Sequence, residues 1–278
     1  DTRGPRVKII ISIRKMALIQ AVFLRGLITI PLLCLIVWRS KAAIRGLSNQ
    51  NKWLVALRVG AETGATIAFL TALKHMPLAN VSAILLALPL AVTMAAALFL
   101  GEPVGWRRWS AIIVGFAGVL IVIRPGLEGF NIYSLSALVA VAFITLREIT
   151  TRRLTSDVPS LTVALWTTIG ITMFSAVIMA GTEWRAVGQL SWLLLLGAAV
   201  AILFGSLLSV MAMRVGEISF VAPFRYTAMI WAIALGILIF GEWPDQPTLI
   251  GTGIIIATGI YSLHREQQRR RMAEAKQG

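Results

Sequence analysis

The residues of this sequence that could do chemistry are charged side chains placed inside long apolar stretches. Arg25, Arg58 and Glu62 each lie within a run of hydrophobic residues, and Arg225 follows Pro223 in another such run. A charge is costly to bury in lipid unless it faces a cavity or a partner, so these groups are functional candidates. Their chemistry would be the binding of a charged ligand group, or proton transfer on Glu62.

Arg58 and Glu62 stand four residues apart, which places them on one face of a helix, where their side chains can pair. Glu62 is the only carboxylate near the middle of a predicted span. Two interpretations stay open for it. It is either a proton-coupling or substrate-amine site, or a structural counter-ion for Arg58 or Arg25.

Arg225 stands two residues after Pro223, which removes a backbone donor and can open the helix. Broken helices beside charges are typical ligand sites of transporters, whereas snorkelling to the interface is the alternative for this arginine. Arg147 and Glu148 close another run, and we interpret them as a satisfied interfacial pair. The interior charges are net positive, which favours a ligand with a carboxylate over a bare cation.

Aromatic residues inside the spans could stack on an apolar ligand group, although each is more often used for packing. Two prolines, Pro89 and Pro223, are candidate hinges. The predicted cavity set is Arg25, Arg58, Glu62, Phe69, Phe143, Trp166, Arg225, Tyr226 and Trp231.

Nothing in the sequence predicts catalysis, a cofactor or a metal site. His75 lies in a short connection and His264 at the end of the last apolar run, without an H-E-x-x-H, G-x-S-x-G or Walker A pattern. No aspartate lies inside a predicted span, and the lone Cys34 can form neither a disulfide within the chain nor a thiol pair. We expect no catalytic residue and no enzyme activity.

The elements that position these residues are membrane-spanning helices. The chain is 58% hydrophobic and 14% charged, with a mean hydropathy of +0.82, which is far more apolar than a globular domain. The net charge of +14 lies mostly in short connections and at the two ends, which does not suit nucleic acid. Runs of spanning length cover residues 16–38, 53–73, 77–99, 106–123, 130–150, 159–180, 190–213, 217–240 and 247–263.

The distribution of Lys and Arg predicts the orientation. Alternate connections and the tail after residue 264 are basic, whereas the opposite connections carry only Lys74, Arg124 and Arg185, so the C-terminus is expected to be cytoplasmic. Nine spans with a cytoplasmic C-terminus would place the basic stretch 1–15 outside, against this pattern. The apolar part of this stretch, "VKIIISI", is too short to supply a further span. We expect a damaged first helix or a missing segment there.

Two predicted spans end in similar sequences, "ALFLGEPV" at 97–104 and "ILIFGEWP" at 237–244. Aligning the two Gly-Glu pairs also aligns the helices around them, and it predicts two inverted repeats of five helices, a plan common in transporters. We expect a first repeat at 1–128, a second at 129–264 and a basic tail at 265–278.

The segments "QAVFLRGLITI", "HMPLANVSAILLALPLAVTMAAALFLGEPVGWRRWSAIIVGFAGVLIVIRPG" and "RVGEISFVAPFRYTAMIWAIALGILIFGEWP" resemble the drug/metabolite transporter superfamily, specifically its EamA-type ten-helix members. The chain looks most similar to bacterial amino-acid exporters of the YddG type. The resemblance implies an all-α polytopic protein with an inverted five-plus-five repeat around a central cavity, cytoplasmic termini and alternating access.

The sequence and this resemblance together predict a secondary exporter of small metabolites in the bacterial inner membrane, with aromatic or other neutral amino acids as the expected substrates. Expected partners are the small-molecule substrate, the lipid bilayer and protons as a candidate coupling ion, with a monomeric chain. A multidrug exporter of cationic compounds is the first alternative, and a channel or a membrane-embedded enzyme the second.

Overall fold

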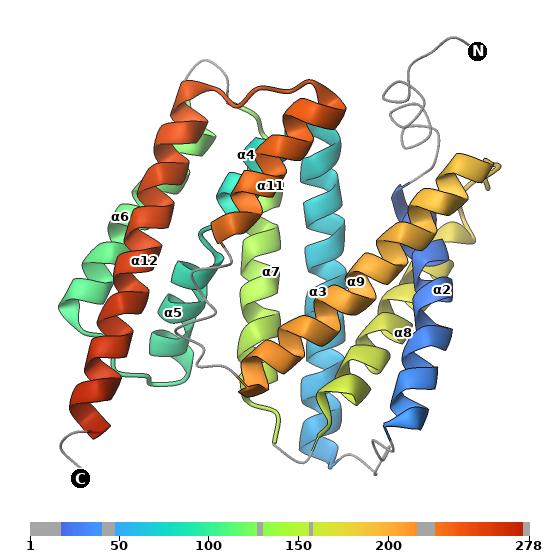
Figure 1. Ribbon diagram of the computed structural model, residues 1–278, viewed down its shortest axis with the longest axis horizontal. Coiled ribbons are helices and arrows are strands. Elements are labelled where there is room, and N and C mark those ends of the chain that lie inside the picture. The colour runs from blue at the N-terminus through green and yellow to red at the C-terminus, as the bar shows by residue number, and fades with distance from the viewer. Residues whose placement is uncertain (1–17, 41–47, 127–129, 156–157, 216–225, 275–278) are drawn as a thin grey trace. The chain divides into compact units, whose positions relative to one another are not determined.

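The computed structural model describes residues 18–40, 48–126, 130–155, 158–215 and 226–274, and within them every regular element is a helix (Figure 1). The helices are α2 (Leu18–Arg39), α3 (Asn49–His75), α4 (Leu78–Leu85), α5 (Leu88–Phe99), α6 (Trp106–Ile123), α7 (Ser134–Arg152), α8 (Ser160–Met179), α9 (Gln189–Val215), α11 (Thr227–Leu235), the π-helix η2 (Gly236–Phe240) and α12 (Gln246–Glu274).

The described helices are those of a polytopic membrane protein, as the sequence predicts. Seven helical stretches of the described chain are long and apolar enough to cross a bilayer, at 18–39, 49–75, 78–99, 106–123, 134–152, 161–179 and 246–265. Two shorter apolar helices, at Gln189–Gly205 and Thr227–Phe240, fall within the remaining predicted spans.

The predicted span 77–99 is two helices, α4 and α5, separated at Leu86 and Ala87. Pro89 explains the break, because it has no N–H and its ring displaces the carbonyl of Leu85 four residues before it. The amide of Ala87 bonds to the carbonyl of Ile84, 3.1 Å away and only three residues back, before α5 starts at Leu88. The span is therefore interrupted halfway along its length.

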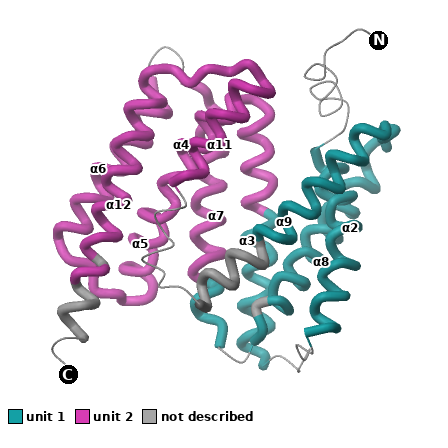
Figure 2. The backbone as a smooth tube through the Cα atoms, viewed as in Figure 1, with its two compact units in different colours: residues 1–63, 150–214 teal, residues 64–149, 215–278 magenta. Residues whose placement is uncertain are grey.

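The chain forms two compact units, and each unit takes segments from both halves of the sequence (Figure 2). Unit 1 comprises residues 1–63 and 150–214, and unit 2 comprises residues 64–149 and 215–278. These boundaries differ from the predicted division near residue 128, which concerns internal symmetry and stays a prediction.

Unit 1 is built on α2 and α8, which pack along each other. A core cluster of Leu33, Val37, Leu165 and Leu203 lies between its helices. Gly26 of α2 faces the side chain of Thr172 on α8 so closely that an added Cβ would collide with the hydroxyl. Small residues let membrane helices approach in this way. The chain's single cysteine, Cys34, is exposed on α2.

Unit 2 is built on α6 and α12, whose backbones approach through glycines. A Cβ added at Gly251 would stand 2.5 Å from the carbonyl oxygen of Gly118, and one at Gly118 would stand 2.9 Å from that of Gly251. The side chains of Ile84, Leu90 and Ile255 are fully buried beside this pair of helices. Unit 2 therefore holds a close backbone contact that only glycine permits.

The two Gly-Glu endings have the same local structure. Gly101 and Gly241 both have positive φ angles, 69° and 70°, a conformation that favours glycine. The amides of Glu102 and Glu242 then bond to carbonyls six residues back, Ala96 at 3.3 Å and Gly236 at 3.0 Å. Glu242 also accepts a hydrogen bond from the amide of Leu78 at 3.2 Å, so its carboxylate stands at the N-terminus of α4, where negative charge is favoured.

Candidate functional site

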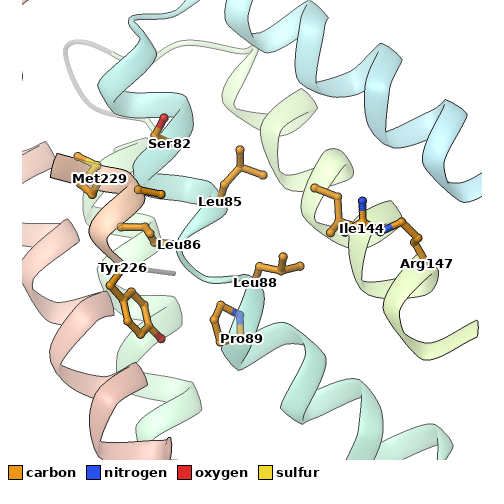
Figure 3. Close-up of a pocket in the computed structure, with 10 residues that line it drawn as sticks. Ser82, Leu85, Leu86, Leu88, Pro89, Ile144, Arg147, Tyr226 and Met229 are labelled. Atoms are coloured by element: carbon orange, nitrogen blue, oxygen red, sulfur yellow. The ribbon is translucent and has the colours of Figure 1, made fainter. Parts of the chain in front are cut away.

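The break between α4 and α5 opens onto a pocket of about 320 Å³ within unit 2 (Figure 3). This volume lies in the range of small-molecule sites, although near its lower end. The pocket is lined by Ser82, Leu85, Leu86, Leu88, Pro89, Ile144, Arg147, Tyr226, Ala228 and Met229.

Three parts of the fold supply these residues. The first is the end of α4, the break and the start of α5, which contribute Ser82, the leucines and Pro89. The second is the start of α11, which contributes Tyr226, Ala228 and Met229, and the third is α7. Helix α7 contributes Ile144 and Arg147, which share a face because they are three residues apart. In Figure 3, Leu85 and Leu88 are drawn between this pair and Tyr226.

Lining residues from the α4–α5 segment and from the start of α11 occupy equivalent positions in the predicted repeat alignment. If Glu102 is aligned with Glu242, the lining residues Leu86 and Leu88 fall on Tyr226 and Ala228, which also line the pocket. Transporters with internal repeats place their sites where such equivalent segments meet. The repeat itself remains a prediction.

In the part of the chain that the structure describes, the pocket has apolar walls and one charged lining residue, Arg147. The side chain of Arg147 is 23% exposed, and its Nη2 donates to Oε1 of the neighbouring Glu148 over 2.7 Å. The lining also includes two residues with hydroxyl groups, Ser82 and the buried Tyr226, whose hydroxyl lies against Gly259 of α12. An apolar body with an acidic or hydrogen-bonding head would suit such a surface.

Two residues named from the sequence belong to this pocket, the hinge candidate Pro89 and the cavity candidate Tyr226. The others in unit 2 lie elsewhere. The ring of Phe143 packs against Gly64 of α3, Phe69 packs on the core of unit 2, and Trp231 is 68% exposed on α11. Arg225 and Pro223 lie outside the described residues.

The remaining candidates lie in unit 1. Glu62 of α3 acts electrostatically on Arg25 of α2, so the structure brings this acid and this base together. Arg58 donates from Nη1 to Oγ1 of Thr151, and Trp166 of α8 is 45% exposed. Both interpretations of Glu62, as a proton-coupling or substrate-amine site and as a counter-ion, stay predictions.

Sequence reasoning missed Arg147 as a lining residue. Its pairing with Glu148 is present as expected, but the same side chain also faces the pocket. The available signal was the spacing from Ile144, which puts an aliphatic residue and a cation on one face of α7. That signal identifies a face but not the helix break opposite it.

Comparison with known families identifies the chain. Residues 7–124 and 131–263 match the EamA-like transporter family. The chain therefore belongs to the EamA-like transporter family, as the resemblance of its motifs predicts, and it is a multi-pass membrane protein.

Several curated relatives are transporters of small molecules. A riboflavin transporter of Vibrio cholerae is 32% identical over 191 residues, which cover 68% of this chain but only 63% of that relative. An S-adenosylmethionine uptake transporter of Rickettsia bellii is 26% identical over 198 residues, covering 70% and 67%. The pseudopaline exporter CntI of Pseudomonas aeruginosa is 24% identical over 255 residues, covering 90% and 87%.

The fold has a counterpart among solved structures. One crystal structure contains a chain that aligns with a TM-score of 0.60 at 19% identity, covering 89% of this chain and 88% of the other. At this identity the likeness concerns the fold alone.

Proposed function

We propose that this protein exports aromatic or other neutral amino acids across the bacterial inner membrane by alternating access. The observation that carries the proposal is the pocket of unit 2, in which apolar walls surround a helix break and Arg147 supplies a positive charge. An apolar side chain fits the walls, and an α-carboxylate is the natural partner of a guanidinium.

The charge of the pocket argues against the first alternative, a multidrug exporter of cations. None of the ten described lining residues is Asp or Glu, so a cationic compound would find no counter-charge among them and would meet Arg147. A carboxylate, in contrast, would be attracted by the positive charge of Arg147. The lining therefore favours a zwitterion or an anion over a quaternary amine.

The named substrates of the relatives differ, so they support a small metabolite without selecting one. Riboflavin and S-adenosylmethionine are carried by relatives named as transporters or uptake transporters, and pseudopaline by one named as an exporter. The direction proposed here, export, and the cytoplasmic C-terminus rest on the resemblance and on the Lys and Arg distribution.

Proton coupling is the open part of the mechanism, and Glu62 is the residue on which it depends. Glu62 acts electrostatically on Arg25, so a proton taken up by Glu62 would change that interaction. If Glu62 is solely the counter-ion of Arg25, transport runs down the substrate gradient and does not respond to a pH gradient.

The test is flux into and out of proteoliposomes containing the full chain, with radiolabelled phenylalanine and leucine beside the cationic dye ethidium. We expect saturable amino-acid flux and no ethidium flux. Ethidium flux without amino-acid flux would contradict the proposal in favour of the multidrug alternative, and flux that does not saturate would favour the channel.

The same vesicles separate the two roles of Glu62. If Glu62 couples protons, Glu62→Gln removes the acceleration of flux by a pH gradient. If it is a counter-ion, flux in the parent does not respond to a pH gradient, and the variant loses stability without any change in that behaviour. Glu183→Gln, at an exposed position between α8 and α9, is the matched control.

A further inference from the structure

Among the residues that the structure describes, the pocket of unit 2 offers a partner for only one of the two charges of an amino acid. Arg147 can bind the carboxylate, but none of the described lining residues is acidic, so none of them matches an ammonium group. The other polar side chains on this lining, those of Ser82 and Tyr226, are neutral hydroxyls. The described lining therefore matches an acid and does not require an amino group.

The size of the pocket limits the body of the ligand. A cavity of about 150 Å³ lined by aliphatic and aromatic side chains is enough for benzene. At about 320 Å³, the pocket has room for one ring or a branched alkyl group together with a short chain that ends in a carboxylate. Its leucines, Pro89, Ile144 and Met229 are suited to hold such a body.

The carboxylate already paired with Arg147 belongs to Glu148. Oε1 of Glu148 accepts from Nη2 of Arg147 over 2.7 Å, and Glu148 itself does not line the pocket. A guanidinium has five N–H donors in a planar fork and can serve two carboxylates, but these repel each other. Glu148 is therefore a built-in competitor of any acidic ligand that reaches Arg147.

We propose that Arg147 is the specificity-determining residue of the pocket and that the pocket takes monocarboxylates with an aryl or branched alkyl body, with or without an amino group. Glu148 weakens this binding by competing for the same guanidinium. The inference deepens the proposed function and rests on it for its role in transport, but its chemistry is tested by binding alone.

The experiment is isothermal titration calorimetry on the purified full chain with four ligands of one ring and one chain length. They are 3-phenylpropionate, phenylalanine, the neutral 3-phenylpropionamide and the cation 2-phenylethylamine. We expect the two carboxylates to bind, the amide to bind about 10- to 100-fold more weakly and the amine not at all, because hydrogen bonds to charged groups are strong. Equal binding of acid and amide would overturn the proposal.

Two neighbouring variants should act in opposite directions on 3-phenylpropionate. Arg147→Gln is expected to weaken its binding about 10- to 100-fold and to remove the preference for acid over amide. Glu148→Gln is expected to strengthen it several-fold, because the competing carboxylate is gone. If the pair were only structural, both variants would weaken binding together, and that result would overturn the proposal.

Two further variants keep the test decisive. Arg152→Gln, on the same helix but exposed and off the lining, should leave all four affinities unchanged. If Arg147→Gln does not fold, Arg147→Lys serves instead, because it keeps the positive charge but lacks the planar set of N–H donors. It should reduce the ratio of the affinities for 3-phenylpropionate and 3-phenylpropionamide. An unchanged ratio in a folded Arg147 variant would overturn the proposal.

The failure of this inference and that of the proposed function give different results. Binding of 3-phenylpropionate that depends on Arg147, without any flux of phenylalanine, supports the inference and contradicts amino-acid export. Phenylalanine flux that is the same in Arg147→Gln as in the parent supports export and contradicts the inference.

Discussion

The two units place their charges differently. Unit 1 holds Arg25, Arg58 and Glu62, yet the hollow of about 550 Å³ on its surface is lined by none of them; its lining is Ile28, Gln189, Trp192, Leu193 and Leu196. In unit 2 the pocket and its charge coincide, because Arg147 is part of the lining. A charge inside a span is thus a weaker indicator of a ligand pocket than a charge opposite a helix break.

The units also differ in the packing of their main helix pairs. In unit 1 the close contact at Gly26 is made by the side chain of Thr172, whose hydroxyl donates to the carbonyl of Thr168 over 2.7 Å and would have to give up that bond to move. In unit 2 the contact at Gly251 is made by the backbone carbonyl of Gly118, which cannot move without displacing α6. The same small substitution should therefore have unequal effects in the two units.

The largest expected effect is the destabilisation caused by Gly251→Ala. Because the added methyl group meets backbone, we expect a loss of about 2–3 kcal/mol in the free energy of unfolding, measured by denaturation in one detergent. Gly26→Ala should cost about 1 kcal/mol or less, and Thr172→Ala should relieve it.

Gly253→Ala is the matched control for this comparison. It lies two residues further along α12 with open space around its Cα, and alanine favours a helix. We expect no loss of stability. An equal loss for the alanine variants of Gly26 and Gly251 would show that the contrast between side-chain and backbone contact is wrong.

An intermediate effect is expected from removing the helix break. Pro89→Ala allows α4 and α5 to join, so the helix should gain about 1 kcal/mol of stability while the pocket changes shape and amino-acid flux falls several-fold. Pro31→Ala in unit 1, where α2 continues through the proline, should gain stability without loss of flux. Thermal unfolding and vesicle flux of both variants test this, and equal flux in the two would contradict the role of the break.

The smallest effect concerns an ion pair outside the spans, between Arg124 and Asp245 of unit 2. Partial burial raises the pKa of Asp245, but hydrogen bonds from Thr248 and Arg124 outweigh it, so the pKa lies below its ordinary value. A lowered carboxyl pKa stabilises the fold above the unfolded-state pKa, and this contribution is lost as the pH falls through the folded-state value. Because the ion pair is exposed and screened by solvent, its contribution to the free energy of unfolding is below about 1 kcal/mol.

Asp245→Asn should therefore lower the unfolding temperature slightly at pH 7, and this deficit should be smaller at pH 3. The measurement is thermal unfolding of parent and variant at both pH values. Unit 1 offers a reference without a carboxylate, the bond of 2.7 Å from Nε2 of Gln20 to the carbonyl of Arg185, so Gln20→Ala should show no such pH dependence. A deficit of Asp245→Asn that is as large at pH 3 as at pH 7 would contradict the electrostatic cause.

The spans could be predicted from the sequence because they depend on local properties, and Pro89 was identified as a candidate hinge, although the span 77–99 was predicted as one helix. Hydropathy over about 20 residues locates a helix such as Leu18–Arg39, and Pro89 interrupts its helix through its own ring. The repeated Gly-Glu endings also follow locally, since glycine is favoured at positive φ angles.

The site could be predicted only in part, because its lining depends on which helices meet. The charges of unit 1 were identifiable as isolated groups, but the electrostatic partner of Glu62 lies on another helix, at Arg25. Arg147 was interpreted as part of an interfacial pair because it lies near the end of a span. The sequence does not show that the break at Pro89 lies across the pocket from it. The division into two units combines distant segments, which hydropathy does not encode.

The single cysteine gives this protein a practical advantage for following motion. Cys34 is exposed on α2 in unit 1, so one spin label can be attached without first removing any native thiol. A second cysteine at the exposed Gln246, the first residue of α12 in unit 2, would complete a labelled pair. Pulsed electron paramagnetic resonance on that pair would record the distance between the units with and without ligand.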